Sequence, residues 1–250
     1  MADESPFKVR KYDPDRRVQV GWGGEGKSFK SLKLPAGIAI DGDGVCYVTD
    51  ARSGTVSKFD KNGQFLRKWG DAGPKEKWLS QPLGVAADGN NDIYVVDSGN
   101  SRIVKYSSVG IVKKTWGKQG SEHGQFYLPT GVAVNSRNEV IVVEAGRIQK
   151  FTSEGVFIDA FGKQGSANEE LNRCLGVCCD KDDNIYVANG GNNRVQKFSP
   201  NGLFIGSFGS KGTGAGQMAE PIAVAINGKG YVFVLEKDNG RIQEFQPSGK

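Results

Sequence analysis

Residues 93–106 read IYVVDSGNSRIVKY, two strand-like segments joined by a short polar turn. The first segment, Ile93–Val96, has no polar residue, as expected of a strand that is packed on both faces. Asp97–Ser101 has the composition of a turn, and Ile103–Tyr106 alternates apolar and polar residues. A small apolar segment precedes this hairpin, and a charged alternating segment, Ile111–Gly117, follows it. The stretch therefore predicts four short antiparallel strands in succession.

This succession recurs five times along the chain. Each copy has a glycine or an alanine in its first apolar segment, at Gly37, Gly84, Gly131, Gly176 and Ala223, with spacings of 47, 47, 45 and 47 residues. A period of roughly 40 to 50 residues with four strands per unit is typical of a β-propeller, in which each repeat forms one blade. We therefore expect an all-β propeller of four-stranded antiparallel blades, with repeats that start near residues 35, 82, 129, 174 and 221.

The N-terminal residues contain two more strand-like segments, while the last repeat has only three. We expect residues 18–22 to supply the missing fourth strand and so to close the ring, which leaves residues 7–12 as a surplus strand. A count of five blades is favoured, with a six-bladed or incomplete ring as the alternative. Residues 1–250 are expected to form a single domain, in which residues 1–22 are the closing segment.

Several short motifs recur in the repeats. They are the start Pro-x-Gly-(Val/Ile)-Ala at 35–39 and 129–133, the segment Ile-Tyr-Val-x-(Asp/Asn) at 93–97 and 185–189, and the hairpin Gly-Asn-x-Arg-(Ile/Val)-x-Lys-(Tyr/Phe) at 99–106 and 191–198. Together they resemble the NHL-repeat family of β-propellers, and the chain is similar to the propeller domain of TRIM-NHL-type proteins. The resemblance implies a docking platform for proteins or RNA, although a minority of the family belongs to enzymes such as metal-dependent lyases.

An acidic or amide residue faces an arginine across the hairpin of most repeats. The pairs are Asp97 with Arg102, Asn189 with Arg194, Glu236 with Arg241 and, in a shorter hairpin, Glu144 with Arg147. Such an acceptor can hold the guanidinium group and fix the loop. The first repeat breaks the pattern, because Asp50 faces Thr55 and Arg52 is displaced toward the tip of the loop.

The composition indicates an intracellular chain. No stretch approaches 18 apolar residues, and the N-terminus is charged with no hydrophobic run behind it, so we expect no membrane span, no secretory signal and a cytoplasmic location. Cys46, Cys178 and Cys179 replace small apolar strand residues, which favours a reducing compartment. Cys174 is either a reactive thiol or, as we favour, a plain small-residue substitution.

Convergent catalytic groups are scarce. The single histidine, His123, lies in a glycine-rich loop with no nucleophile motif, and no cysteines have the spacing of zinc ligands. We therefore predict no catalytic residue, no metal and no cofactor. The polar residues that end the second strands could converge on calcium, but the arginine partners in their own hairpins favour a structural role. These residues are Asp50, Asp97, Glu144, Asn189 and Glu236.

The remaining candidate is a recognition surface on the rim that carries the loops between blades. Basic and aromatic residues gather there around the first repeat, and we predict that they bind a partner: Lys27, Phe29, Lys30, Lys33, Arg52, Lys75, Lys77, Trp78 and Tyr127. Such a mixture suits the phosphates and bases of single-stranded RNA or an acidic protein segment. A second set of loop residues is interpreted as structural wedges: Leu32, Leu79, Phe126, Leu171 and Met218.

The functional hypothesis from sequence is a non-enzymatic platform that binds a protein or RNA partner and is monomeric as an isolated domain. One alternative is a metal-dependent lyase or hydrolase with its site in the central channel. Another is an architectural subunit of a larger assembly.

Overall fold

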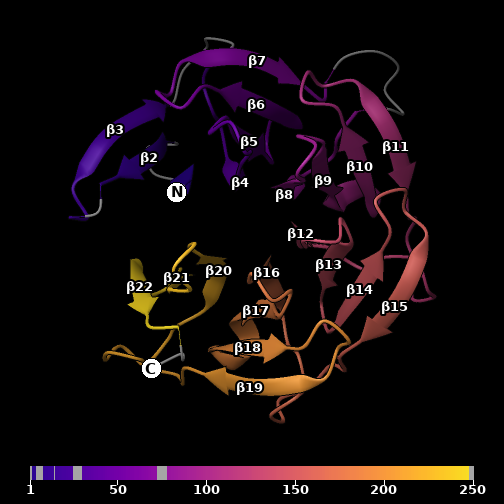
Figure 1. Ribbon diagram of the computed structural model, residues 1–250, viewed down its shortest axis with the longest axis vertical. Helices are drawn as coiled ribbons and strands as arrows, with labels where there is room; N and C mark the ends of the chain where they lie inside the picture. Colours follow the sequence, from indigo (N-terminus) through magenta and orange to yellow (C-terminus); the bar gives the residue numbers. More distant parts are fainter. Residues whose placement is uncertain (1, 4–7, 14, 25–29, 72–77, 248–250) are drawn as a thin grey trace. The chain divides into compact units, whose positions relative to one another are not determined.

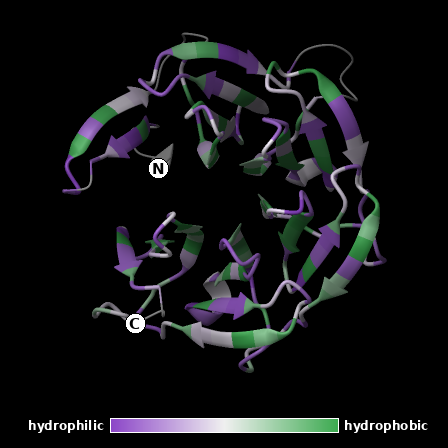
Figure 2. Ribbon diagram, in the orientation of Figure 1, coloured by the Kyte–Doolittle hydropathy of each residue, from purple (hydrophilic) through white to green (hydrophobic). Residues whose placement is uncertain are grey.

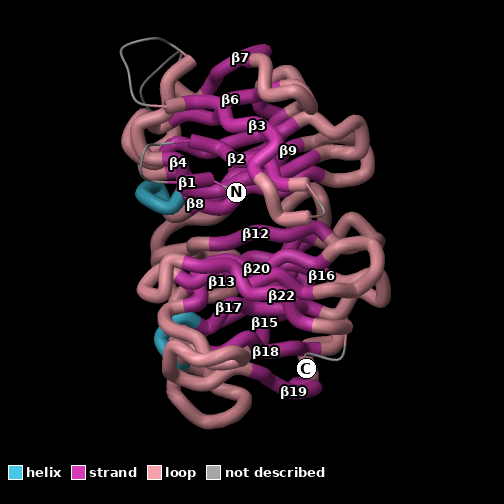
Figure 3. The backbone as a smooth tube through the Cα atoms, turned by 90° about the vertical axis from the view of Figure 1, so that its left-hand side faces the viewer, coloured by secondary structure: helices cyan, strands magenta, loops and turns pink. Residues whose placement is uncertain are grey.

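The computed structural model describes residues 2–3, 8–13, 15–24, 30–71 and 78–247 of the 250-residue chain. The chain divides into two compact units, residues 1–119 and 120–250. Strands and loops make up nearly all of the described residues, and the helical content is two short 3₁₀ turns, η2 (Ser98–Asn100) and η3 (Gly190–Asn192) (Figure 3). None of the described helices has the length and apolarity needed to cross a bilayer.

The first unit contains two four-stranded antiparallel sheets, each built from consecutive strands (Figure 1). One sheet consists of β4 (Pro35–Ile40), β5 (Cys46–Asp50), β6 (Thr55–Phe59) and β7 (Phe65–Trp69). The other consists of β8 (Pro82–Ala87), β9 (Ile93–Asp97), β10 (Arg102–Tyr106) and β11 (Val112–Trp116). The second strands, β5 and β9, are buried along their whole length, as the apolar sequence of Ile93–Val96 predicts for β9.

The second unit contains two more four-stranded sheets and one three-stranded sheet. Its first sheet consists of β12 (Gly131–Val134), β13 (Val140–Glu144), β14 (Arg147–Phe151) and β15 (Phe157–Phe161). The next consists of β16 (Cys174–Cys179), β17 (Ile185–Asn189), β18 (Arg194–Phe198) and β19 (Phe204–Phe208). The last has three strands, β20 (Pro221–Ile226), β21 (Val232–Glu236) and β22 (Arg241–Phe245). Each of the five sequence repeats thus forms one antiparallel sheet, which confirms the predicted propeller blades.

The N-terminal residues form a sheet of their own, with the order β1 (Ala2–Asp3), β2 (Lys8–Tyr12) and β3 (Val18–Gly23). Residues 8–12 are not the surplus strand that we expected, because β2 hydrogen-bonds to β3. Closure of the ring by residues 18–22 stays a prediction. A short turn joins the two strands, and the amide of Arg17 donates to the Asp13 carboxylate at 2.8 Å. Closing so short a loop costs less chain entropy than pairing with a distant segment. Figure 2 shows the alternation of hydrophobic and hydrophilic residues along β3.

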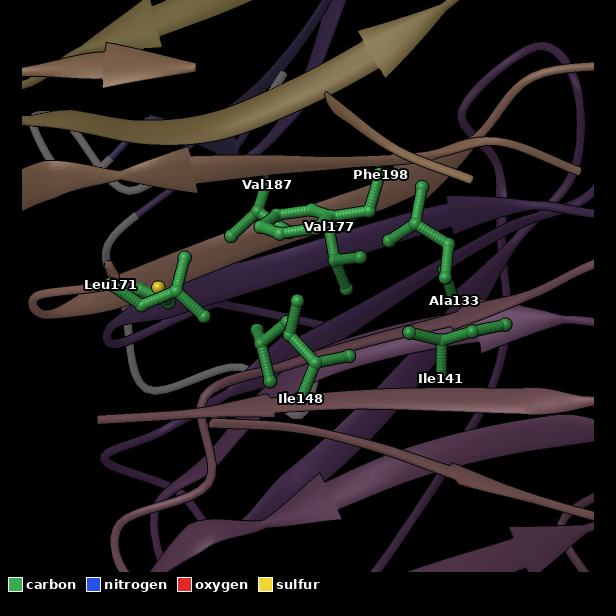
Figure 4. Packing of buried hydrophobic residues seen from close by; sticks show 10 residues of the cluster. Ala133, Ile141, Ile148, Leu171, Val177, Val187 and Phe198 are labelled. Atoms are coloured by element: carbon green, nitrogen blue, oxygen red, sulfur yellow. The ribbon is translucent and has the colours of Figure 1, made fainter. Parts of the chain in front are cut away.

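The apolar faces of neighbouring sheets pack together within each unit. In the second unit one cluster joins Ile141 and Ile148 of one blade to Val177, Val187 and Phe198 of the next (Figure 4). The five predicted wedge residues are all buried: Leu32, Leu79, Phe126, Leu171 and Met218. Because these wedges belong to the loops between blades, the same packing that forms the core also fixes those loops.

Candidate functional site

A buried acidic residue at the end of β9 holds together two loops of the second repeat. Asp97 accepts a hydrogen bond from the amide of Ser80 at 2.6 Å and another from Nε of Arg102 at 2.6 Å. Its side chain is fully buried, and that of Arg102 is 20% exposed. The carboxylate therefore fixes the loop that precedes the repeat against the hairpin between its second and third strands.

The third and fifth repeats use a glutamate in the same way. Glu144 accepts from the amide of Tyr127 at 2.7 Å and from Nε of Arg147 at 2.8 Å. Glu236 accepts from the amide of Ala219 at 2.9 Å and from Nε of Arg241 at 2.8 Å. Burial acts to raise the pKa of Glu236, but the hydrogen bonds from Arg241 and its other donors outweigh it, so this pKa is lowered.

These contacts confirm three of the predicted acid–arginine pairs and give them a structural role. The oxygen atoms that could have converged on calcium are already used within each repeat. Among the residues that the structure describes, no group of three or more His, Cys, Asp or Glu side chains is arranged to hold a metal ion.

The fourth repeat departs from the predicted pair. Asn189 accepts from the amide of Asn172 at 2.9 Å and donates to the carbonyl of Glu170 at 3.0 Å, so it still fixes the loop. Arg194 donates instead to loop carbonyls, including that of Glu170 at 2.9 Å. A neutral amide does not attract the guanidinium group as a carboxylate does. The prediction of a direct contact between Asn189 and Arg194 was therefore wrong.

The first repeat lacks the arginine altogether. Asp50 is fully buried and accepts from three backbone amides, those of Lys33 at 2.5 Å, Leu34 at 3.2 Å and Ser53 at 2.9 Å. Thr55 stands where the other repeats have arginine, and its buried hydroxyl has no hydrogen-bond partner among the described residues. Asp50 thus brings the loop before β4 and the turn after β5 to one carboxylate, without a bound guanidinium.

Next to this carboxylate the first unit contains a cavity of about 400 Å³. Residues from both blades of the unit line it: Leu34, Ala51, Arg52, Gln81 and Leu83. The walls are tied together by hydrogen bonds, because the amide of Ala51 donates to the carbonyl of Leu34 at 2.9 Å and the Thr49 hydroxyl donates to the carbonyl of Leu83 at 2.5 Å. The cavity is therefore preformed by the backbone of the fold.

Arg52 is the one charged side chain on the described walls of this cavity. It is exposed, and it makes no hydrogen bond or ion pair with any described residue. At the equivalent position the other repeats have Gly99, Gly146, Gly191 and Asp238. In the second unit, by contrast, Arg173 of the loop before β16 is paired with Glu220 at 2.6 Å. The guanidinium group of Arg52 is thus available for an anion.

The predicted partner-binding residues fall into three groups. Lys27, Phe29, Lys75 and Lys77 lie outside the described residues. Lys30, Lys33, Arg52 and Trp78 are exposed in the first unit, where Asp50 brings Lys33 and Arg52 onto one rim. Tyr127 is 57% exposed and belongs to the second unit. Binding by this set stays a prediction, as do the protein or RNA partner and the monomeric state.

Sequence reasoning found Arg52 but missed the rest of the cavity wall. Leu34, Ala51, Gln81 and Leu83 are ordinary residues of the repeat, and their sequence gives no sign of chemistry. The available signal was an arginine at a position that is glycine in three other repeats.

The remaining reactive side chains are held in structural settings. Cys174 is buried, and burial raises the pKa of its thiol to about 12, which supports the small-residue interpretation. All four cysteines are free thiols. His123 is exposed on its loop, as expected, and stacks on Phe157 with 4.4 Å between ring centroids.

The NHL-repeat family model matches two segments of the chain, residues 79–106 and 171–198. This confirms the resemblance to NHL-repeat propellers, whereas the finer likeness to TRIM-NHL-type proteins stays a prediction. No curated protein matches the chain.

Solved structures with the same fold include enzymes. The chain is similar to virginiamycin B lyase from Staphylococcus aureus, with 16% identity, a TM-score of 0.65, and coverage of 97% of this chain and 78% of that one. It is also similar to a streptogramin B lyase, with 17% identity, a TM-score of 0.66, and coverage of 86% of this chain and 66% of that one. The chain thus spans just under two thirds of that protein. A gluconolactonase from Xanthomonas campestris has 14% identity and a TM-score of 0.61, with coverage of 81% of this chain and 69% of that one. At these identities the likeness shows the fold.

The prediction of a non-enzymatic platform was wrong. We inferred a docking surface from the resemblance to NHL-type propellers, but the similar solved propellers are lyases and a lactonase. In a propeller the chemistry depends on the residues of the loops and the cavity walls. The fold itself therefore does not favour docking over catalysis.

Proposed function

We propose that this NHL-repeat propeller is an enzyme that acts on a small anionic molecule bound in the cavity beside Arg52. The observation that carries the proposal is an exposed guanidinium group on the wall of a preformed cavity, which makes no hydrogen bond or ion pair with any described residue. A volume of about 400 Å³ lies within the range of roughly 300 to 1,000 Å³ that is usual for small-molecule sites. The lyases and the lactonase show that propellers of this fold can carry catalysis.

The walls suit a molecule with one anionic end and an apolar body. Arg52 can bind a carboxylate or phosphate through two parallel hydrogen bonds, while Leu34 and Leu83 offer apolar surface to the remainder. Gln81 adds one amide donor and acceptor. A guanidinium group at this place also stabilises negative charge that develops on an oxygen during an elimination or an acyl-transfer reaction.

Binding is tested on the whole chain with a panel of small carboxylates and phosphate monoesters, measured by thermal shift and titration calorimetry. At least one anion is expected to raise the melting temperature. Arg52→Met is expected to weaken its binding about tenfold or more, because a charged hydrogen bond is lost. Arg67→Met is the matched control, since Arg67 is an exposed arginine of β7 outside the cavity. Equal affinity of both variants, or no anion bound, would contradict the site.

Catalysis is tested by following carboxylate-bearing lactones and esters by NMR in the presence of the whole chain. Turnover that is lost in Arg52→Met and kept in Arg67→Met is the expected result. If an anion binds through Arg52 and none of these compounds is converted, the site is real but the enzyme proposal fails.

We also propose a cytoplasmic location. All four cysteines are unpaired, which suits a reducing compartment. Measuring thiol oxidation after cell fractionation tests this, because a disulfide-bonded form in an oxidising compartment would contradict it.

A further inference from the structure

The loops that precede the third and fourth repeats have the same length and the same internal geometry. Each runs for ten residues, 117–126 and 162–171. Arg147 donates to the carbonyls of Ser121 and Gln125, and Arg194 donates to those of Ser166 and Glu170, which are the equivalent positions. The two loops can therefore be compared residue by residue.

In the third repeat a ring from the loop covers a ring from the outer strand. His123 stacks on Phe157 with ring centroids 4.4 Å apart and planes inclined by 10°. Phe157 itself meets Phe151 edge to face, at 6.0 Å and 78°. The imidazole thus occupies the exposed face of an anchored phenylalanine, in the stacked arrangement that aromatic pairs favour.

The fourth repeat keeps the phenylalanine pair but lacks the covering ring. Phe204 meets Phe198 edge to face, at 5.8 Å and 69°. Phe198 belongs to the buried cluster of Figure 4, and Phe204 packs against that cluster, so both rings are held by the core. The loop residue equivalent to His123 is Asn168. A cavity of about 400 Å³ here is lined by Phe198 and Phe204 together with loop residues that include Ala167 and Glu169.

The charges on the cavity walls favour a cation. Lys163 and Glu170 form an ion pair at 3.5 Å, and the Glu170 carboxylate also accepts from the amide of Ala167 at 3.0 Å. Glu169 is exposed and has no ion pair with any described residue. One lysine and two glutamates leave one negative charge in excess on the wall.

We propose that this cavity binds a flat cationic aromatic ring, of the pyridinium or imidazolium class, stacked on Phe204 in the place that His123 takes on Phe157. Stacking on the ring and the attraction between a cation and a ring face both favour such a ligand at this site. The excess carboxylate of Glu169 adds a long-range attraction that falls with salt. The cavity belongs to the second unit and shares no residue with the Arg52 cavity.

The test titrates the whole chain with 1-methylpyridinium, followed by calorimetry and by the shifts of the probe's NMR signals. One bound probe per chain is expected, with weaker binding at higher salt. Phe204→Leu is expected to weaken binding about fivefold, and Glu169→Gln about threefold. Asn168→His supplies a ring from the loop itself and is expected to abolish binding while the melting temperature is unchanged.

Two controls make the outcome decisive. Phe157→Leu changes the equivalent ring of the third repeat and is expected to leave binding at Phe204 unaltered. Benzoate, which has a flat ring and the opposite charge, is expected not to bind. The proposal is overturned if Asn168→His binds 1-methylpyridinium as the wild type does, or if benzoate binds as tightly as the cation.

Discussion

At the scale of single residues, the same position in each repeat decides whether a loop is clamped by an ion pair. Asp97, Glu144 and Glu236 hold an arginine and a loop amide at once. Asp50 binds amides only, and Thr55 and Ser57 are left with buried hydroxyls that have no described partner. The loss of one arginine in the first repeat accompanies both the orphaned hydroxyls and the exposed Arg52.

The stability of the fold should depend on pH through Glu236. Its pKa is lowered below the ordinary 4.5 in the folded chain, so the unfolded chain binds the proton more tightly. The carboxylate therefore stabilises the fold above about pH 5 and loses this effect as the pH falls through 4.5 and below. The free energy of unfolding, measured by denaturant at pH 7 and pH 3, is expected to differ less in Glu236→Gln than in the wild type. Glu122→Gln, which changes an exposed carboxylate, is the control and should show the same difference in free energy of unfolding between pH 7 and pH 3 as the wild type.

The two orphaned hydroxyls of the first repeat are expected to destabilise it. Thr55→Val combined with Ser57→Ala removes both buried groups and should raise the free energy of unfolding by about 1 kcal/mol. Urea denaturation measures this. Thr115→Val, on the exposed face of β11, is the control and is expected to change the stability little. A destabilised double variant would mean that the hydroxyls are satisfied in solution.

At the scale of elements, the inner strands approach one another closely within each unit. A Cβ on Gly37 of β4 would lie 2.3 Å from the carbonyl oxygen of Leu83, and one on Gly176 of β16 would lie 2.8 Å from Cα of Ala223. The recurring glycine, which sets the period in the sequence, is therefore required by strand packing between blades. The position of this glycine in each repeat was predictable from the sequence. The neighbouring strand that it contacts is known only from the structure.

Gly37→Ala is expected to lower the free energy of unfolding by about 2 kcal/mol, because the new methyl group collides with the backbone of β8. Since Leu83 lines the Arg52 cavity, anion binding should weaken as well. Thermal unfolding and calorimetry measure the two effects. Gly89→Ala, where a Cβ meets nothing within 4 Å, is the control. Identical stability of the two variants would refute the close approach of β4 and β8.

At the scale of the whole molecule, the chain consists of two compact units, and the N-terminal sheet belongs to the first. Val9 is buried in a cluster with Cys46, Val48 and Phe59, and Trp22 packs against that cluster. The Trp22 ring lies 6.1 Å from that of Phe59, and a side chain on Gly63 would collide with it. The N-terminal strands therefore cover the side of the first blade.

Trp22→Ala should accordingly weaken the first unit selectively. Loss of a half-buried tryptophan is expected to lower its stability by about 2 kcal/mol. Amide hydrogen exchange should show faster exchange in β4–β7 and unchanged exchange in β16–β19. Leu66→Ala, at an exposed position of β7, is the control. Equal loss of protection in β16–β19 would show that the contribution of Trp22 is not local.

The repeat length, the strand order within each repeat and the buried wedges follow from the sequence alone, because each depends on neighbours a few residues apart and on a period that recurs. The tertiary structure decided the partner of β3, the lack of a described partner for Arg52 and the walls of the cavity beside it. These features depend on contacts between repeats, such as the Thr49 hydroxyl on the carbonyl of Leu83, 34 residues away. The sequence of one repeat does not determine which side chains of the neighbouring repeat lack a partner.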